Sequence, residues 1–425
     1  MLELKYILAN PDEVKGNLKK RNDPEKLKLV DELIHLSAVD RKLKHDVEQL
    51  RHQRNNVTDE IRQGKKAGHD VAHLMEKAKN IPHQLIKLEQ EWEGTQKSIH
   101  DVLYSIPNLL HESVPIGASD ADNVVVREVG HKPNFDFEPK GHTDILEALG
   151  IVDLESAAKV SGARFYFLKG QLVMLEYALL KFTLDFMHKK DFILIEPPSM
   201  LRREFYEGVT DMKDFEDVMY KIEGEDLYLI ATSEHPMASM LAGKVLQKTQ
   251  FPVKYAGISP CFRKEAGAHG KDTKGIFRVH QFQKVEQFVF ALPEQSWEIH
   301  EQLLQNAEEI MQSLGIPYRV VNVCTGDIGS IAAKKFDIEA WMPAQNTYRE
   351  MVSCSNCTSY QATRLNIKYQ DGEEKKFVHT LNSTAIATPR LLVAIIENFQ
   401  QKDGSIKVPN VLLPYMNGVE VITKV

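Results

Sequence analysis

Two long stretches of the sequence repeat apolar residues at intervals that alternate between three and four. The first runs from Leu33 to Ile61 and the second from Val71 to Ile106, with GKKAGHD (64–70) between them. Such spacing is typical of a helix that buries one seam against a second helix, and the two glycines of GKKAGHD indicate a short turn. The pattern therefore predicts an antiparallel helical hairpin at about residues 27–106. At about 1.5 Å of rise per residue, each helix would reach about 50 Å.

The far half of this hairpin is mildly basic, although the chain as a whole carries a net charge of −7. Residues 41–70 contain eight Lys or Arg and five Asp or Glu. A solvated coiled-coil surface and a surface that contacts phosphates both fit this charge pattern, so the pattern does not decide between these two interpretations. If the hairpin contacts phosphates, the residues that we select for that role are Arg51, Arg54, Lys65 and Lys66.

The rest of the chain combines strand-like and helix-like stretches that do not alternate regularly. A linker rich in proline and turn-forming residues, 105–123, leads into it. Strands are expected at 192–200, 227–231, 253–260 and 276–291, and helices at 172–190 and 296–315. Because the order is not a βαβ repeat, we predict an α+β body built on a mainly antiparallel sheet flanked by helices. Neither a Walker A sequence nor a GxGxxG after a strand occurs, which argues against the two common nucleotide-binding folds.

Cysteine content and hydropathy indicate the cellular compartment of such a chain. It has four cysteines, too few for the disulfide framework of a secreted protein. Cys354 and Cys357 form a CxxC, but no second ligand pair follows it, so we expect no zinc. The N-terminus does not resemble a targeting peptide, and no apolar run is long enough to span a membrane. These features predict a cytoplasmic protein without a membrane partner.

Residues 261–288, CFRKEAGAHGKDTKGIFRVHQFQKVEQF, concentrate cations, one aromatic ring and carboxylates. If 276–291 is a strand, its even-numbered side chains share one face. Arginines bind phosphates, an aromatic ring stacks on a purine, and a carboxylate binds an ammonium group. The segment therefore fits a nucleotide together with an amino acid, although a surface hairpin with cross-strand charge pairs would look similar. The side chains on that face are Arg278, His280, Phe282, Lys284, Glu286 and Phe288.

Two further segments suit the same kind of ligand. Thr232 and Glu234 follow an apolar strand two residues apart, so we expect them to share a face and to bind a small polar amine. Near the C-terminus, Thr388 is the expected N-cap of a buried helix, with Pro389 at its first position. Arg390 follows, and an arginine at a helix N-terminus is suited to a phosphate.

These motifs together resemble the seryl-tRNA synthetases, a family of the class II aminoacyl-tRNA synthetases. FRKE with RVHQFQKVEQF resembles the second class motif, TSE the serine-binding motif, and YREMVSCSN the segment for metal and ATP. HTLNSTAIATPR resembles the third class motif and ILIEPP the first. The resemblance covers essentially the whole chain. It implies an N-terminal tRNA-binding domain at 1–110 that carries the hairpin, and a catalytic domain at 111–425.

The resemblance also implies roles for individual residues at the ATP end. Arg263 would hold the α-phosphate, Arg390 the γ-phosphate, and Phe282 would stack on the adenine. Glu265 would meet the adenine amino group, and Arg278 would close over the ring or the phosphates. Glu350 and Ser353 would bind Mg²⁺; they are three residues apart, so a bulge or a strand end is required there. The full ATP set is Arg263, Lys264, Glu265, Arg278, Val279, His280, Gln281, Phe282, Glu350, Met351, Val352, Ser353 and Arg390.

At the amino-acid end, the resemblance implies that Glu286 takes the serine ammonium group. The serine-binding set is Thr232, Ser233, Glu234, Glu286, Asn382 and Thr384. The third class motif usually has glycines before its arginine, whereas this chain has Ser-Thr-Ala-Ile-Ala-Thr-Pro before Arg390. Small side chains must therefore allow the close approach that glycine would permit.

The implied activity is ATP-dependent activation of L-serine and its transfer to tRNA(Ser), with tRNA(Sec) open as a second acceptor. The implied enzyme is an AMP-forming ligase that uses ATP with Mg²⁺ and forms a homodimer through residues 172–198. Two alternatives belong to other functional classes. A relative could load serine onto a different acceptor, and a catalytically silent relative could bind RNA as a regulator. The long hairpin argues against the first, and the intact set of charged motif residues argues against the second.

Overall fold

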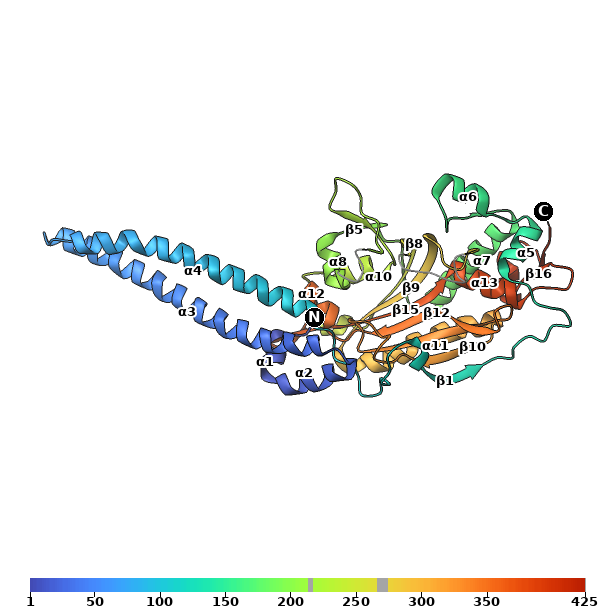
Figure 1. Cartoon of the computed structure of the whole chain (residues 1–425), viewed down its shortest axis with the longest axis horizontal. Helices are drawn as coiled ribbons and strands as arrows, with labels where there is room; N and C mark the ends of the chain where they lie inside the picture. The colour runs from blue at the N-terminus through green and yellow to red at the C-terminus, as the bar shows by residue number, and fades with distance from the viewer. Residues whose placement is uncertain (213–216, 266–273, 425) are drawn as a thin grey trace. The chain divides into compact units, whose positions relative to one another are not determined.

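A computed structural model describes residues 1–212, 217–265 and 274–424 of the chain. The loop 266–273 of the cation-rich segment lies outside these described residues. The chain divides into two compact units, Met1–Pro107 and Asn108–Val425 (Figure 1). We describe each unit by itself.

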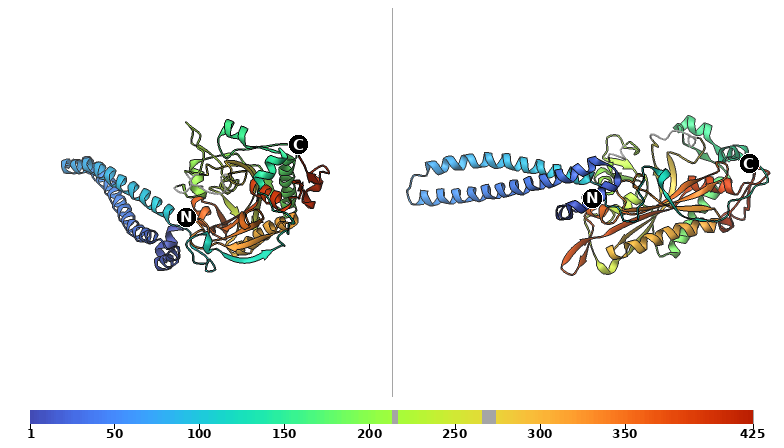
Figure 2. Two further views of the ribbon diagram at one scale, coloured as in Figure 1. Left: turned by 45° about the vertical axis from the view of Figure 1, so that its right-hand side comes forward. Right: turned by 60° about the horizontal axis from the view of Figure 1, so that its bottom comes forward.

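The N-terminal unit is helical, and its two long helices form the predicted hairpin. α3 and α4 lie side by side in all the views of Figures 1 and 2. The Asp23 side chain caps α3 by accepting the Glu25 N–H at 3.0 Å. The elements are α1 (Leu4–Ala9), α2 (Pro11–Leu18), η1 (Lys19–Arg21), α3 (Pro24–Lys66) and α4 (Ala72–Ser105).

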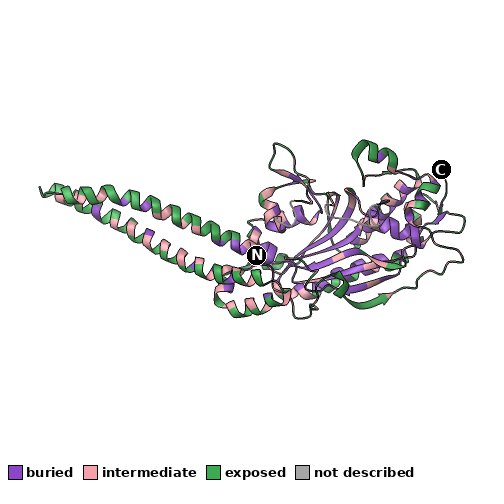
Figure 3. Ribbon diagram, viewed as in Figure 1, coloured by how far each residue is buried: buried purple, intermediate pink, exposed green. Residues whose placement is uncertain are grey.

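The seam of the hairpin is where the intervals of three and four place it. Val47 and Val57 of α3 and Ile81 and Leu85 of α4 are buried, whereas most of the remaining surface is exposed (Figure 3). One polar residue in the seam, Asp40, accepts a hydrogen bond from Trp92 Nε1 at 2.7 Å. A polar pair at a seam position favours one register of the two helices over others.

The second unit is built on an eight-stranded sheet, which confirms the predicted α+β class. The strand order is β1-β10-β11-β12-β15-β9-β8-β4, and every pair is antiparallel except β4 with β8. The strands are β1 (Val124–Val129), β4 (Ile193–Ile195), β8 (Val253–Phe262), β9 (Gln281–Ala291), β10 (Tyr318–Asn322), β11 (Lys334–Met342), β12 (Thr347–Asn356) and β15 (His379–Ala387).

Shorter strands form small sheets around the large one. They are β2 (Val152–Asp153), β3 (Phe167–Leu168), β5 (Met200–Arg202), β6 (Leu227–Leu229), β7 (Val245–Gln247), β13 (Lys368–Asp371), β14 (Glu374–Phe377), β16 (Ile406–Lys407) and β17 (Val421–Ile422). Short 3-10 turns are η2 (Asp120–Asp122), η3 (Lys248–Gln250), η5 (Pro293–Gln295) and η6 (Asn410–Tyr415).

Helices pack on the sheet because alternate side chains of β9 belong to two different cores. Val285 and Val289 join the larger core with α7, α11 and α13, whereas Phe288 and Phe290 join the smaller core with α8, α10 and α12. The helices are α5 (His142–Leu149), α6 (Leu154–Ser161), α7 (Gln171–Lys189), α8 (Arg203–Val209), α10 (Glu234–Ser239), α11 (Ser296–Leu314), α12 (Tyr360–Leu365) and α13 (Thr388–Asn398).

Two local predictions were wrong. The strand expected at 276–291 begins only at Gln281, where its pairing with Phe262 of β8 starts, and the adjacent Ile276 and Phe277 are both buried. Thr388 is not an N-cap, since α13 already includes it and Ala387 precedes the helix. The Thr388 hydroxyl instead donates to Glu176 of α7 at 2.7 Å.

Candidate active site

A cavity of about 440 Å³ opens over the middle strands of the sheet, a size typical of small-molecule sites. Phe282, Lys284 and Glu286 of β9 line it from one face, as their even numbering predicted. Thr384 of β15 stands opposite Glu286 in the antiparallel register, and Gly257 of β8 stands opposite on the other side. Strand pairing therefore brings residues that are far apart in the sequence onto one floor.

At one end of the cavity, arginines surround aromatic rings. The Arg263 guanidinium lies 5.4 Å from the centroid of the Phe282 ring. Arg278 precedes β9 instead of lying within it, yet it lines the same cavity and pairs with Glu265 at 3.3 Å. The Arg390 guanidinium lies 5.6 Å from the Phe277 ring. Planar cations beside flat rings are groups that bind phosphates and an aromatic base.

Glu350 and Ser353 both line the cavity because β12 contains a bulge. In the pairing of β11 with β12, Ile338 faces Val352 and Glu339 faces Glu350, so Met351 is the extra residue. One extra residue reverses the alternation of side chains, which brings two residues three apart to the same face. The irregularity that the sequence required at this position is therefore present in the strand.

The electrostatics around Glu350 favour its ionised form. Desolvation acts to raise the pKa of this carboxyl group, but Arg390, Lys335 and Arg263 together hold it below its ordinary value. Arg390 Nη1 lies 3.2 Å from Glu350 Oε1. Asp337, on the neighbouring strand β11, behaves in the opposite way, since burial raises its pKa to about 7. Glu350 is thus an anion that faces the cavity, with its side chain about half exposed at 47%.

Two glutamates line the other end of the cavity, of which Glu286 is buried and Glu234 is partly buried. Burial, followed by the charge of Glu286, raises the pKa of Glu234 to about 7. Burial also raises the pKa of Glu286, against the effect of Lys284. Lys284 forms an ion pair with Glu286 and donates to Thr232 Oγ1 at 3.2 Å. This end therefore holds a hydroxyl and two carboxyl groups around one ammonium group.

Thr232 and Glu234 come together through a helix start and not through strand alternation, which corrects our prediction. β6 ends at Leu229 and α10 begins at Glu234. The Thr232 hydroxyl accepts the backbone N–H of Glu234 at 3.2 Å. The Glu234 carboxylate accepts from Gln361 Nε2 at 3.0 Å and from Asn382 Nδ2 at 3.2 Å. These bonds fix the carboxyl group in the cavity wall.

Gly257 allows α10 to approach the sheet. A Cβ atom at this position would lie 2.7 Å from Met237 Sδ and 2.9 Å from Ser233 Cβ. The Ser233 hydroxyl donates to the Gly257 carbonyl oxygen at 3.0 Å. Ser233 therefore joins α10 to β8, and its side chain is fully buried.

Most residues predicted for the site line the cavity, and a few do not. Ser233 and Val352 are buried, His280 Nδ1 lies 2.8 Å from the Arg263 carbonyl oxygen, and Lys264 and Gln281 are exposed. The sequence-based set omitted lining or supporting residues that the pattern could have suggested only in part. Lys284 shares the even face of β9, whereas Phe277, Lys335 and Gln361 carry no local signal.

The predicted phosphate contacts lie in the N-terminal unit. Arg54, Lys65 and Lys66 are exposed on α3. Arg51 Nη2 instead forms an ion pair with Glu89 Oε1 of α4 at 2.7 Å, so its charge is partly neutralised within the hairpin.

The four cysteines do not contribute to a metal site among the described residues. All four cysteines are free and buried. Within residues 1–212, 217–265 and 274–424, no group of three or more His, Cys, Asp or Glu is arranged to hold a metal ion. In the same part of the chain, no helix is both long and apolar enough to cross a membrane.

An antiparallel sheet with this strand order, arginines over its central strands and a third arginine at the start of α13 define a class II aminoacyl-tRNA synthetase. In agreement, the family described as the class II core domain of tRNA synthetases (G, H, P, S and T) matches residues 217–399. The seryl-tRNA synthetase N-terminal domain matches residues 1–110.

The relatives identify the family within that class. A serine–tRNA ligase of Methanocella arvoryzae is 54% identical over 99% of this chain and 100% of its own length. The chain belongs to the seryl-tRNA synthetase family. The crystal structure of seryl-tRNA synthetase from Pyrococcus horikoshii complexed with ATP is 49% identical, with a TM-score of 0.94 over 100% of both chains. The cytoplasmic serine–tRNA ligase of Naegleria fowleri in complex with AMP is 40% identical, with a TM-score of 0.86 over 98% of this chain and 96% of that chain.

Proposed function

We propose that this enzyme activates L-serine with ATP and transfers it to the 3′ end of tRNA(Ser), with tRNA(Sec) as a second acceptor. The observation that carries the proposal is the combination of groups that line one cavity. Arginines and an aromatic ring, the Glu350 carboxylate, and a hydroxyl with two carboxyl groups all line it. A nucleoside triphosphate and a small hydroxy amino acid would each meet matching groups there.

Activation needs positioned charges more than a covalent side chain. The serine carboxylate attacks the α-phosphorus of ATP, which forms seryl-adenylate and releases pyrophosphate. Arg263 neutralises charge that develops on the α-phosphate, and Arg390 holds the γ-phosphate. Phe282 stacks on the adenine, while Glu265 and Arg278 separate from each other to contact it. Because preorganised cations act on the transition state, loss of Arg263 should lower the rate by about 10²-fold or more.

The ammonium group of serine would take the place of the Lys284 ammonium group in the cavity. Glu286 and Thr232 now contact the Lys284 ammonium group, and the serine ammonium group has the same chemistry. Glu234, held by Gln361 and Asn382, accepts the serine hydroxyl. Alanine would leave Glu234 without the hydroxyl that the site is suited to bind, and such sites discriminate by about 10⁴-fold.

Mg²⁺ fits the residues that were proposed to hold it. Magnesium sites in ATP-dependent enzymes commonly use one or two protein oxygens and complete their coordination with phosphates and water. Glu350 is ionised and faces the cavity, and Ser353, which also hydrogen-bonds to Asp337, lines the same cavity. When bound, the ion would neutralise phosphate charge.

Transfer requires a tRNA acceptor, for which we assign residues 1–110 as the tRNA-binding domain and 111–425 as the catalytic domain. The long hairpin with exposed Arg54, Lys65 and Lys66 supports recognition of RNA through its phosphates and shape. We place the enzyme in the cytoplasm. Parallel aminoacylation of tRNA(Ser) and tRNA(Sec) transcripts tests the range of acceptors.

We also propose a homodimer formed through residues 172–198. Several large apolar side chains near the edge strand β4 are exposed, which supports a contact there. They are Tyr177, Ile193, Leu194 and Met200. Analytical ultracentrifugation of the full chain would test the assembly, and a monomer at micromolar concentration would contradict it.

ATP–pyrophosphate exchange tests the activation step. Purified protein should catalyse exchange with serine in the absence of tRNA, and not with threonine, alanine or glycine. Exchange with none of the four would contradict the proposed activation and would favour an RNA-binding role for the hairpin.

A further inference from the structure

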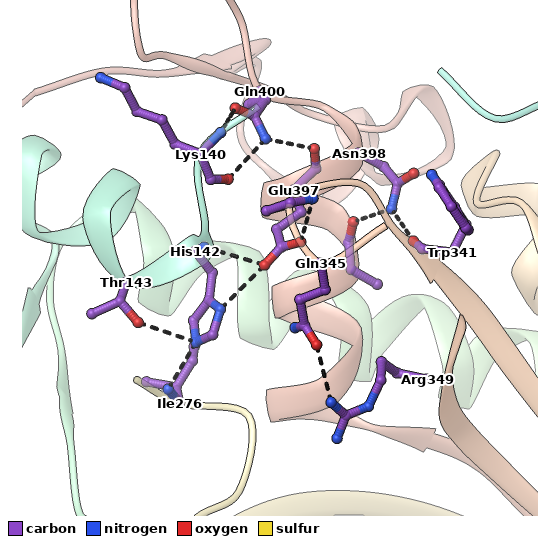
Figure 4. A network of polar contacts seen from close by, with 12 residues as sticks. Lys140, His142, Thr143, Ile276, Trp341, Gln345, Arg349, Glu397, Asn398 and Gln400 are labelled. Atoms are coloured by element: carbon purple, nitrogen blue, oxygen red, sulfur yellow. Dashed lines mark hydrogen bonds and ion pairs between the residues drawn. The ribbon is translucent and has the colours of Figure 1, made fainter. Parts of the chain in front are cut away.

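His142, outside the cavity, joins two segments that reach the ATP end of the site. It is the first residue of α5, and its ring is buried. Ile276 N–H donates to His142 Nε2 at 3.3 Å (Figure 4). On the other side, His142 Nδ1 lies 3.3 Å from Glu397 Oε1. An N–H that donates to Nε2 leaves the ring proton on Nδ1, so His142 donates to Glu397 and accepts from Ile276.

Glu397, which lies in the last turn of α13, accepts hydrogen bonds from three N–H groups. Its Oε1 also accepts the backbone N–H of His142 at 3.3 Å, which would otherwise be one of the orphan donors at the start of α5. Its Oε2 accepts the N–H of Ala344, between β11 and β12, at 3.3 Å. The side chain is almost completely buried. The carboxylate therefore ties α13 to α5 and to the β11–β12 turn.

A further series of contacts leads from that turn back to the neighbour of Ile276, so the contacts form a closed circuit. Gln345, next to Ala344, accepts from Arg349 Nη1 at 3.0 Å (Figure 4). The Arg349 guanidinium lies 4.8 Å from the ring of Phe277, the neighbour of Ile276. Phe277 lines the cavity, with Arg390 over its ring. This circuit of contacts therefore supports the Phe277 ring. Arg390, which we assign to the γ-phosphate, lies over that ring.

Gly275 shows how closely the returning segment approaches His142. Its φ is +77°, and a Cβ atom there would lie 2.1 Å from His142 Nε2. Only glycine combines that backbone conformation with that space. The segment from Gly275 to Phe277 is therefore fitted against the imidazole, and Arg278 follows it directly.

We propose that His142, oriented by Glu397, is a positioning residue for ATP. It fixes the Ile276 backbone, and with it Phe277, Arg278 and Arg390, at the triphosphate end of the cavity. The inference rests on the proposed function, because it concerns the nucleotide half of that site. It assigns to His142 no contact with ATP and no part in binding serine.

Two substitutions at His142 separate the bond to Glu397 from the bond to Ile276 at Nε2, where the Thr143 hydroxyl also lies 3.5 Å away. In His142→Gln, the side-chain oxygen can replace Nε2 and accept from Ile276, while the bond to Glu397 is lost. In His142→Asn, the amide can replace Nδ1 and donate to Glu397, while Ile276 loses its acceptor. Each variant loses one buried bond, so a merely structural role would affect both in the same way.

The measurements are the dissociation constant of ATP–Mg²⁺ by calorimetry, and KM for ATP and for serine in pyrophosphate exchange. His142→Asn should bind ATP about tenfold more weakly, since a buried N–H is left unpaired, and His142→Gln should stay within about twofold of wild type. KM for serine should change by less than about twofold in both. Equal ATP affinities in the two variants, or parallel changes in both KM values, would overturn the proposal.

A third variant covers the case in which His142→Asn does not fold. In Glu397→Gln, one carboxamide cannot accept all three N–H groups, so ATP should bind about threefold more weakly with KM for serine unchanged. Wild-type ATP affinity in Glu397→Gln would overturn the proposal. Pyrophosphate exchange by the wild-type protein with serine is measured alongside. If the wild-type protein shows no exchange, the result counts against the proposed function and not against the role of His142.

Discussion

Lys284 and Glu286 form an ion pair inside the cavity, two residues apart on the same face of β9. Both side chains are almost completely buried. An ion pair in such a place costs desolvation energy on both sides, and removal of one partner leaves the other charge uncompensated. The cavity thus holds an internal ammonium group, that of Lys284, beside the carboxylate that we assign to the ammonium group of serine.

The first prediction concerns this pair. Lys284→Met should lower the free energy of unfolding by about 3 kcal/mol, because Glu286 is left buried and unpaired. Serine supplies an ammonium group, so saturating serine should raise the Tm of this variant more than that of wild type. Differential scanning fluorimetry with and without serine measures both effects. Lys375→Met, at an exposed position of β14, is the control, and an equal serine-induced shift in all three proteins would contradict the exchange of ammonium groups.

The second prediction concerns pH. Burial and Glu286 raise the pKa of Glu234 to about 7, so this group stays protonated at a pH where an ordinary glutamate is ionised. If the ionised form accepts the serine hydroxyl, kcat/KM for serine should fall about tenfold per pH unit below about 7 and level off above it. Glu234→Gln should lower kcat/KM and flatten the acid limb. An acid limb that persists unchanged in this variant would assign the titration to another group.

The third prediction concerns magnesium. Glu350→Gln keeps the size of the side chain but removes the charge that faces the cavity. The Mg²⁺ concentration for half-maximal exchange should rise by about 10-fold or more, because a carboxylate contributes much of the affinity for a hard cation. Titration of Mg²⁺ at fixed ATP measures this. Glu339→Gln, also on the sheet but paired with Arg319, is the control, and a similar rise in both variants would argue against Glu350 as the ligand.

The fourth prediction separates the two steps of the reaction. Lys65→Ala with Lys66→Ala should weaken aminoacylation of tRNA(Ser) and leave pyrophosphate exchange unchanged. Each lost phosphate contact should reduce the salt dependence of tRNA binding by about one unit of slope. Arg51→Ala should have a smaller effect on the slope, since Arg51 pairs with Glu89. A double variant with unchanged tRNA binding across a range of salt concentrations would remove these lysines from the interface.

Repetitive patterns in the sequence predicted the structure well. The intervals of three and four located α3 and α4, because a seam repeated along a whole helix averages out local exceptions such as Asp40. Alternation placed Phe282, Lys284 and Glu286 on one face, since pleating fixes that relation wherever a strand is regular.

Prediction failed where the backbone departs from regular geometry. FRV at 277–279 alternates as a strand would, but the adjacent Ile276 and Phe277 are both buried and β9 begins only at Gln281. Thr388 has the residue type of an N-cap, yet a partner on α7 takes its hydroxyl. Long-range contacts decided both cases, and no local pattern encodes the position of Glu176 or the support of Phe277 by Arg349.

The bulge at Met351 makes the site depend on the backbone of β12 as well as on its side chains. If Met351 took regular pleated geometry, Glu350 and Ser353 would lie three residues apart on opposite faces, and one of them would turn away from the cavity. Deletion of Met351 would instead leave these two residues two apart and on one face. A substitution that straightens the strand at Met351 should therefore weaken the proposed Mg²⁺ site, although neither proposed magnesium ligand has been changed.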